Sequence, residues 1–149
     1  MAALTIDRQV PATKHLGADG IVHVFKMPAA TQIWKGGLCA IDTAAGYVVP
    51  CTTDIAARMF AGLALESKLS GASAGVDEIS VVYPEYFTHN VTGATIASIG
   101  DIVTCTDDQT LVIPAGPAAT NFAIGWIAGF ISGTSCVIKT LPLGSKALA

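Results

Sequence analysis

The sequence predicts an all-β protein, a small barrel or sandwich of about 8–10 short strands. The main observation is a pattern that occurs twice, in which a glycine stands fourteen positions before a proline. The glycines are Gly36 and Gly100, and the prolines are Pro50 and Pro114. In both copies an apolar triplet precedes the proline, and a Phe-Ala pair later opens another glycine-containing apolar run. The order of strand, polar turn, strand, proline and further strand is therefore predicted twice.

These two copies, residues 36–66 and 100–130, form a weak internal repeat. Few residues are identical between them, so the sequence suggests a duplication without establishing one. A second observation is that 15 glycines and 7 prolines divide the 149 residues into short apolar runs separated by turns. A chain of this length is expected to fold as one domain with a substantial core.

The charge content argues against one class of function. Lys and Arg total 8 against 11 Asp and Glu, and 13% of the residues are charged, where about 25% is usual in a soluble domain. Nucleic acid binding requires clustered Lys and Arg to neutralise phosphates, and the sequence has no such cluster. Hydrophobic residues make up 52% of the chain, and many of them are alanines. We expect such a surface to be covered by copies of the chain or by a partner.

Residues 1–20 are expected to form an extended N-terminal arm. Prolines and glycines interrupt this segment, its charges occur singly and no periodic apolar face develops. We therefore expect the arm to be extended or disordered until it meets a partner, with few buried contacts to the rest of the protein. It lacks the apolar core of a signal peptide, which predicts synthesis and retention in a cytoplasm. The β domain follows at residues 21–140, and residues 141–149 form a C-terminal tail.

Strands are predicted in order along the first half of the domain. Residues 21–26 form the first convincing strand, in which Val22, Val24 and Lys26 oppose Ile21, His23 and Phe25. Residues 31–35 form a short strand that enters the first repeat. Within that repeat the turn spans residues 42–46, where Gly46 can adopt a positive φ. Residues 54–69 are ambiguous, because apolar residues at four-residue spacing fit a helix while the same run also fits a strand. We prefer the strand.

Further strands are predicted after a flexible loop at residues 70–75. One strand covers residues 78–84 and continues through residues 85–88. Residues 93–99 lead into the second repeat, and the last strand covers residues 135–139.

The longest apolar run, residues 122–131, is the segment to test as a membrane span. It is ten residues long, whereas a spanning helix needs about 20. The run also alternates, and the residues expected to share one face are Phe122, Ile124, Trp126 and Phe130. We therefore predict a strand and no contact with a membrane.

Candidate residues for chemistry are few. The four cysteines lack the short, matched spacings of a zinc site, so we expect buried thiols, with disulfides left open for an oxidising medium. The histidines, His15, His23 and His89, stand in no nucleophile motif. The pair Asp107-Asp108 could attract calcium, but an acidic pair between two strands favours turn chemistry. We predict no catalytic, cofactor-binding or metal-binding residues, and a protein that is not an enzyme.

Two tryptophans remain as candidate anchors. In a chain with few aromatic residues, Trp34 and Trp126 are more often core or subunit-interface residues than ligand platforms. We therefore predict that they anchor the core or an oligomer.

Three blocks of the sequence resemble tailed-bacteriophage capsid decoration, or cement, proteins. The first block, Ile33–Asp42 followed by Ala45–Pro50, resembles the family signature "kGalv-l-aGy-vPa". The second block is Ile99–Thr104 with Asp107–Leu111, and the third is Ala123–Ile127. The resemblance covers roughly residues 21–140 and includes no catalytic signature.

This resemblance implies a small β-barrel or tulip-like domain that binds the outer face of an assembled icosahedral shell. Such proteins commonly sit as dimers or trimers at local symmetry axes and clamp neighbouring major capsid subunits. We therefore expect the major capsid protein as partner, a homo-oligomer with a trimer favoured over a dimer, and a place on the virion exterior after synthesis in the host cytoplasm. No cofactor is expected. The expected capsid contacts lie in the arm and are Ile6, Asp7, Arg8, Val10, Lys14 and His15.

Two other classes of function remain open. Another virion or tail β-structural protein would share the composition and the repeat. A small-ligand-binding β-barrel or an unrecognised enzyme would instead need a pocket with convergent polar groups.

Overall fold

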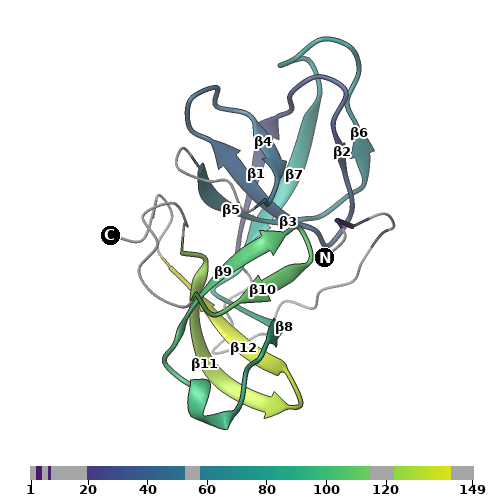
Figure 1. Cartoon of the computed structure of the whole chain (residues 1–149). Helices are drawn as coiled ribbons and strands as arrows, with labels where there is room; N and C mark the ends of the chain where they lie inside the picture. Colours follow the sequence, from purple (N-terminus) through teal and green to yellow (C-terminus); the bar gives the residue numbers. More distant parts are fainter. Residues whose placement is uncertain (1–2, 5–6, 8–19, 53–57, 115–122, 142–149) are drawn as a thin grey trace.

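The computed structural model describes residues 3–4, 7, 20–52, 58–114 and 123–141. Within these ranges the chain forms twelve β-strands and one short 3₁₀ helix. The strands build a five-stranded sheet, a closed barrel and a small two-stranded sheet, arranged as two stacked units (Figure 1). The all-β prediction, with a small barrel, is confirmed.

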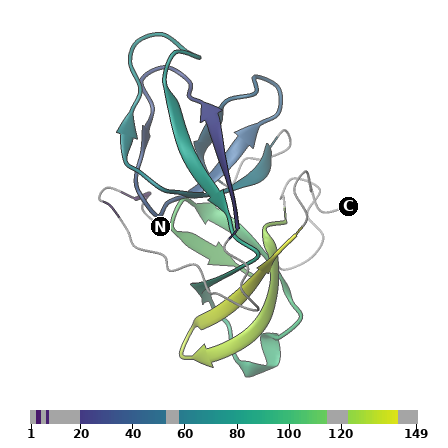
Figure 2. The same ribbon diagram turned by 180° about the vertical axis from the view of Figure 1, so that it is seen from behind.

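The first unit, called here the sheet unit, is an antiparallel sheet with the strand order β1-β7-β5-β3-β4. Its strands are β1 (Ile21–Lys26), β3 (Leu38–Asp42), β4 (Val48–Pro50), β5 (Arg58–Ala64) and β7 (Glu78–Tyr83). The short strands β2 (Gln32–Ile33) and β6 (Lys68–Leu69) lie in its connections and pair with each other. Seen from behind, the sheet unit again lies above the barrel (Figure 2).

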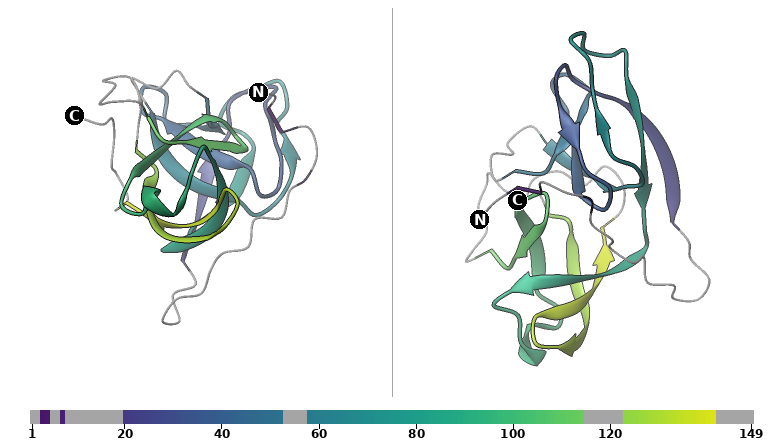
Figure 3. Two further views of the ribbon diagram at one scale, coloured as in Figure 1. Left: turned by 60° about the horizontal axis from the view of Figure 1, so that its bottom comes forward. Right: turned by 90° about the vertical axis from the view of Figure 1, so that its right-hand side faces the viewer.

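The second unit, called here the barrel unit, is a closed barrel with the strand order β10-β8-β12-β11-β9. Its strands are β8 (Tyr86–Thr92), β9 (Ile102–Asp107), β10 (Thr110–Val112), β11 (Gly125–Ser132) and β12 (Ser135–Thr140). The 3₁₀ helix η1 (Ile96–Ser98) connects β8 to β9. β10 closes the barrel because it pairs antiparallel with β9 on one side and parallel with β8 on the other (Figure 3, left).

The strand bounds confirm some of the strand predictions and contradict others. β1 has the predicted bounds, and Gly46 has the expected positive φ of 80° in its turn. Residues 58–64 form a strand, so the helix alternative is wrong there, while residues 53–57 lie outside the described ranges. The predicted continuation of the 78–84 strand through residues 85–88 is wrong. β7 ends before Pro84, which has no amide hydrogen to donate, and the chain then enters the barrel.

The two units share one strand topology. In the sheet unit the neighbouring pairs are β1 with β7, β7 with β5, β5 with β3, and β3 with β4, all antiparallel. In the barrel unit the corresponding pairs are β8 with β12, β12 with β11, β11 with β9, and β9 with β10, again antiparallel. β1, β3, β4, β5 and β7 therefore correspond in order to β8, β9, β10, β11 and β12. The segments that resemble each other in sequence occupy equivalent places.

The strand register is also the same in both units. Cys39 of β3 lies opposite Gly62 of β5. At the equivalent place in the barrel unit, Val103 of β9 lies opposite Gly125 of β11. A β-carbon at Gly62 or Gly125 would lie 2.1 or 2.2 Å from a carbonyl oxygen of the next strand, so both positions require glycine.

The first glycines of the sequence repeat also have equivalent roles. Gly36 donates its amide hydrogen to the carbonyl of Ala64, and Gly100 donates to the carbonyl of Ile127, both at 2.8 Å. Their φ angles are 80° and 97°, where a residue with a β-carbon is disfavoured. The repeated glycines thus end the connection before β3 and β9 and attach it to β5 and β11.

Two hydrophobic cores stabilise this arrangement. The larger core fills the barrel and continues onto the adjoining face of the sheet, so it joins the two units. Its largest fully buried side chains include Leu38 from the sheet unit and Phe87, Ile127 and Ile138 from the barrel unit. The smaller core covers the opposite face of the sheet and includes Met27, which is fully buried.

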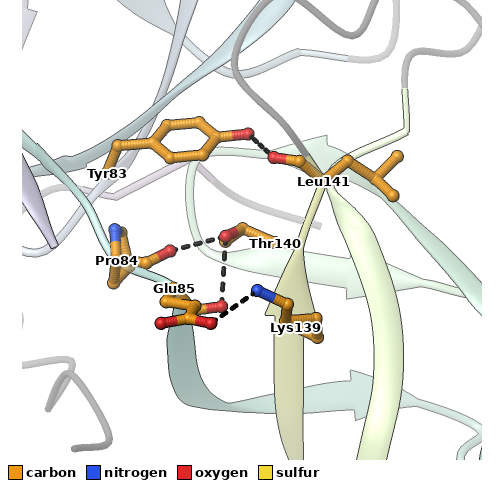
Figure 4. A network of polar contacts seen from close by, with 6 residues as sticks. All are labelled: Tyr83, Pro84, Glu85, Lys139, Thr140 and Leu141. Atoms are coloured by element: carbon orange, nitrogen blue, oxygen red, sulfur yellow. Dashed lines mark hydrogen bonds and ion pairs between the residues drawn. The ribbon is translucent and has the colours of Figure 1, made fainter. Parts of the chain in front are cut away.

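A polar network fixes the crossing from β7 to β8 (Figure 4). The hydroxyl of Thr140, at the end of β12, donates to the carbonyl oxygens of Pro84 at 2.6 Å and Glu85 at 3.1 Å. The Glu85 carboxylate forms an ion pair with Lys139 at 3.0 Å. Because Thr140 is buried, its hydrogen bonds satisfy a hydroxyl that water cannot reach, whereas the ion pair is partly exposed. The last barrel strand therefore stabilises the orientation of the connection between the units.

Candidate interaction surfaces

The predicted arm contacts lie largely outside the described residues. Asp7 is described, whereas Ile6, Arg8, Val10, Lys14 and His15 are not. The Asp7 carboxylate accepts hydrogen bonds from the Ser67 hydroxyl and from the amide of Lys35, the latter at 3.3 Å. Asp7 therefore contacts the connection between β5 and β6. Its assignment as a capsid contact stays a prediction.

Leu4 corrects one expectation about the arm. Its side chain is buried, and its amide donates to the Asp108 carboxylate at 2.7 Å. The backbone carbonyl of Asp108 accepts a further bond from the amide of Leu38, also at 2.7 Å. A β-carbon on Gly37 would lie 3.0 Å from the Trp34 carbonyl oxygen and 3.4 Å from the Leu4 side chain, so Leu4 packs next to this glycine. Leu4 is therefore a buried contact of the arm that the sequence did not predict, because its partner Asp108 is distant in the chain.

The acidic pair in the β9–β10 connection has the structural role of a turn. Asp107 accepts a hydrogen bond from the amide of Gln109 at 2.9 Å, which is an Asx turn. Asp108 is buried and links the N-terminal segment to the sheet unit, as described above. Among the described residues, no three His, Cys, Asp or Glu side chains are grouped so that they could hold a metal ion.

The cysteines are buried thiols, as the sequence indicated. All four, Cys39, Cys51, Cys105 and Cys136, are free. Burial raises the pKa of Cys39 to about 12, and the nearby Asp108 carboxylate adds to this shift. Burial and a hydrogen bond with Cys105 raise the pKa of Cys51 well above its usual value. Reactive cysteines have lowered pKa values, so these environments favour a structural role.

Two histidines are placed by the structure, and His15 lies outside the described residues. The buried ring of His89 lies edge-on to Phe87, with 6.1 Å between ring centroids, and its Nδ1 is 2.8 Å from the Asn90 carbonyl. The ring of His23 lies 5.7 Å from that of Phe25. These aromatic contacts indicate packing roles.

The two tryptophans differ in environment. Trp34 is partly buried, whereas Trp126 is 37% exposed. The predicted shared face of Ile124 and Trp126 is wrong, because Ile124 precedes β11 and is fully buried. Within the strand, Ile127 points into the barrel and Trp126 lies on its outside. The assignment of Trp126 as an oligomer anchor stays a prediction.

Two apolar surfaces lie exposed on the described part of the protein. The first, the β1 edge, consists of Ile21, Val22 and Val24 on a strand whose outer side pairs with no described strand (Figure 3, right). The second, the barrel patch, consists of Ile96, Ile99, Ile102 and Trp126 on the outside of the barrel unit. The sequence predicted β1 with two opposed sets of side chains, but it did not reveal that exposed apolar residues lie on both of its faces.

Comparisons with protein-family models, with curated proteins and with solved structures gave no match. Over the residues that the structure describes, no helix is long and apolar enough to span a membrane.

Proposed function

We propose that this protein binds the outer face of an assembled bacteriophage capsid and stabilises the shell as an oligomeric decoration protein, with a trimer favoured over a dimer. The observation that carries the proposal is the β1 edge, a strand with exposed β-branched side chains at the margin of a sheet. Natural proteins usually protect such an edge, because its free N–H and C=O groups can pair with another chain.

The blocks that resemble decoration proteins have structural roles in this fold. The first block contains Gly36, the second contains Gly100, and these glycines make equivalent hydrogen bonds to β5 and β11. The third block leads into β11 and contains Gly125, which lies against a carbonyl of β12. The resemblance therefore supports the proposed architecture, while binding must depend on exposed residues elsewhere.

The β1 edge fits binding by strand addition. An extended segment of the capsid protein would pair with the outer side of β1, and its side chains would cover Ile21, Val22 and Val24. The one charged residue of β1, Lys26, forms an ion pair with Glu78 at 2.5 Å. The apolar part of the strand thus presents no charge that an incoming strand would have to desolvate.

Stabilisation of the shell follows from such binding. A ligand that binds the assembled capsid and not free subunits stabilises the assembly by mass action. An oligomer that contacts several capsid subunits gains further affinity, because its later contacts are intramolecular. This role requires no enzymatic turnover.

The barrel interior favours this structural role over the binding of a small ligand. Among the described residues, Phe87, Ile127 and Ile138 are fully buried in the core that fills the barrel. A barrel filled by its own side chains differs from the ligand-holding barrels, which enclose a cavity.

Co-sedimentation with undecorated, expanded capsids assembled from the major capsid protein of the same genome tests the proposal. The informative variant is Val22→Lys, because a lysine on an edge strand opposes further strand pairing. We expect its affinity to fall by roughly tenfold or more, equivalent to about 1.4 kcal/mol. The matched control is Val76→Lys, which places the same charge at an exposed valine outside β1. Absence of wild-type co-sedimentation would reject capsid binding, and equal binding by both variants would reject the β1 edge.

A further inference from the structure

Because the two units share one strand register, each residue pair on one unit has an equivalent pair on the other. In the sheet unit, Leu38 of β3 lies opposite Leu63 of β5. In the barrel unit the equivalent pair is Ile102 of β9 and Trp126 of β11. Each pair lies next to the glycine position that the two units share. The four side chains therefore occupy matching places on the same face of the repeated fold.

The environments of these two pairs are opposite. Leu38 and Leu63 are 0% and 2% exposed, and both belong to the core in which the barrel covers the sheet. Ile102 and Trp126 are each 37% exposed. The same face of the repeated fold is therefore covered by protein in one unit and open in the other.

Neighbouring residues enlarge the open face. Ile99 is 49% exposed and Ile96 is 71% exposed. The segment that carries them is attached to β11, because the Gly100 amide donates to the carbonyl of Ile127 at 2.8 Å. The barrel patch thus gathers four exposed apolar side chains from β9, β11 and the segment that is hydrogen-bonded to β11.

We propose that the barrel patch is the contact through which copies of this chain associate, with the patch of one copy covered by a second copy. A second copy is the expected partner, because the equivalent face of the sheet unit is already covered by the barrel unit of the same chain. The four residues of the patch are uncharged, and Lys139, which lies opposite Trp126 on β12, is already paired with Glu85 at 3.0 Å. A second copy can therefore cover the patch without leaving this lysine unpaired. The inference rests on the oligomeric part of the proposed function and is independent of capsid binding.

Molar mass measured by light scattering over a dilution series, without capsids, tests the inference. The wild type is expected to form an oligomer at high concentration, and Ile102→Asp is expected to be a folded monomer there. Ile21→Asp is the matched control, because it makes the same change at an exposed isoleucine of the β1 edge. It is expected to keep the wild-type mass. Thermal melts of all three proteins establish that the variants are folded.

Trp126 provides a second readout that needs no charged substitution. In Trp34→Phe, Trp126 is the sole tryptophan, because the chain has two. Dilution through the association range is expected to shift its emission to longer wavelength as the ring becomes more exposed to water. This measurement decides the question if Ile102→Asp does not fold.

Three results would overturn the inference. They are a wild type that is monomeric at every concentration, an oligomer that persists in folded Ile102→Asp, and a Trp126 emission that dilution leaves unchanged. If Ile102→Asp kept its mass but lost co-sedimentation with capsids, the patch would face the shell instead. A monomeric Ile102→Asp beside a wild type that never binds capsids would support the patch and reject the proposed function.

Discussion

Substitution of Gly125 by alanine tests the equivalence of the two units. A β-carbon at this position would lie 2.2 Å from the carbonyl oxygen of Lys139, whereas ordinary contact begins at 3.4 Å. The obstacle is backbone that belongs to the β11–β12 ladder, so relief requires the two strands to separate by roughly 1 Å, and overpacking of this kind costs about 1–3 kcal/mol. We expect Gly125→Ala to lie in the upper half of this range and to lower the Tm by roughly 4–12 °C.

Gly129 supplies the control within the same strand. A β-carbon there would lie 3.6 Å from the Val137 side chain, which is ordinary contact. Gly129→Ala is therefore expected to be neutral or to stabilise by up to about 1 kcal/mol, because alanine lowers the entropy of the unfolded chain. Gly62→Ala, at the equivalent place in the sheet unit, is expected to be at least as damaging as Gly125→Ala. In addition to the close contact, Gly62 has a φ of 128°, which a residue with a β-carbon rarely adopts. Thermal and urea melts of the three variants measure these differences. Equal stability of Gly125→Ala and Gly129→Ala would refute the reasoning.

Three further predictions concern buried groups. Leu4→Ala is expected to lower the free energy of unfolding by about 1–3 kcal/mol in urea melts, because the side chain is buried, and an unchanged midpoint would show that its contact does not persist in solution. Iodoacetamide at pH 8 is expected to leave the native Cys39 thiol unmodified, since its pKa is raised to about 12, and to label it after denaturation; mass spectrometry detects either outcome. Burial raises the pKa of Tyr83 from 10.0 to about 12, so the unfolded state loses this proton first and Tyr83 lowers stability as pH rises between these values. Melts across this range should show a smaller alkaline loss in Tyr83→Phe than in the wild type.

Local sequence patterns were sufficient for most strands and for the lack of long helices among the described residues. The opposed sets of side chains in residues 21–26 predicted β1, and the turn residues predicted the positive φ of Gly46. The repeated glycine and proline spacing predicted which segments would correspond. Strand identity and turn geometry depend on residues close together in the chain, which is why these predictions succeeded.

Contacts between distant residues were decided by the tertiary structure. No local pattern pairs Leu4 with Asp108, and none shows that β10 closes the barrel against β8. Barrel closure and the burial of Leu4 depend on strand twist, packing and long-range hydrogen bonds, which no short pattern encodes.

The exposure of equivalent apolar side chains also depends on tertiary packing. Leu38 and Ile102 occupy matching positions in strands of similar sequence, and local pattern predicts both to be apolar strand residues. Leu38 is buried because the barrel packs on that face of the sheet, whereas no described part of the chain covers Ile102 to the same extent. The sequence by itself determined that each strand has an apolar side chain at this place. Only the packing of one unit on the other decided which of the two remains available to a partner.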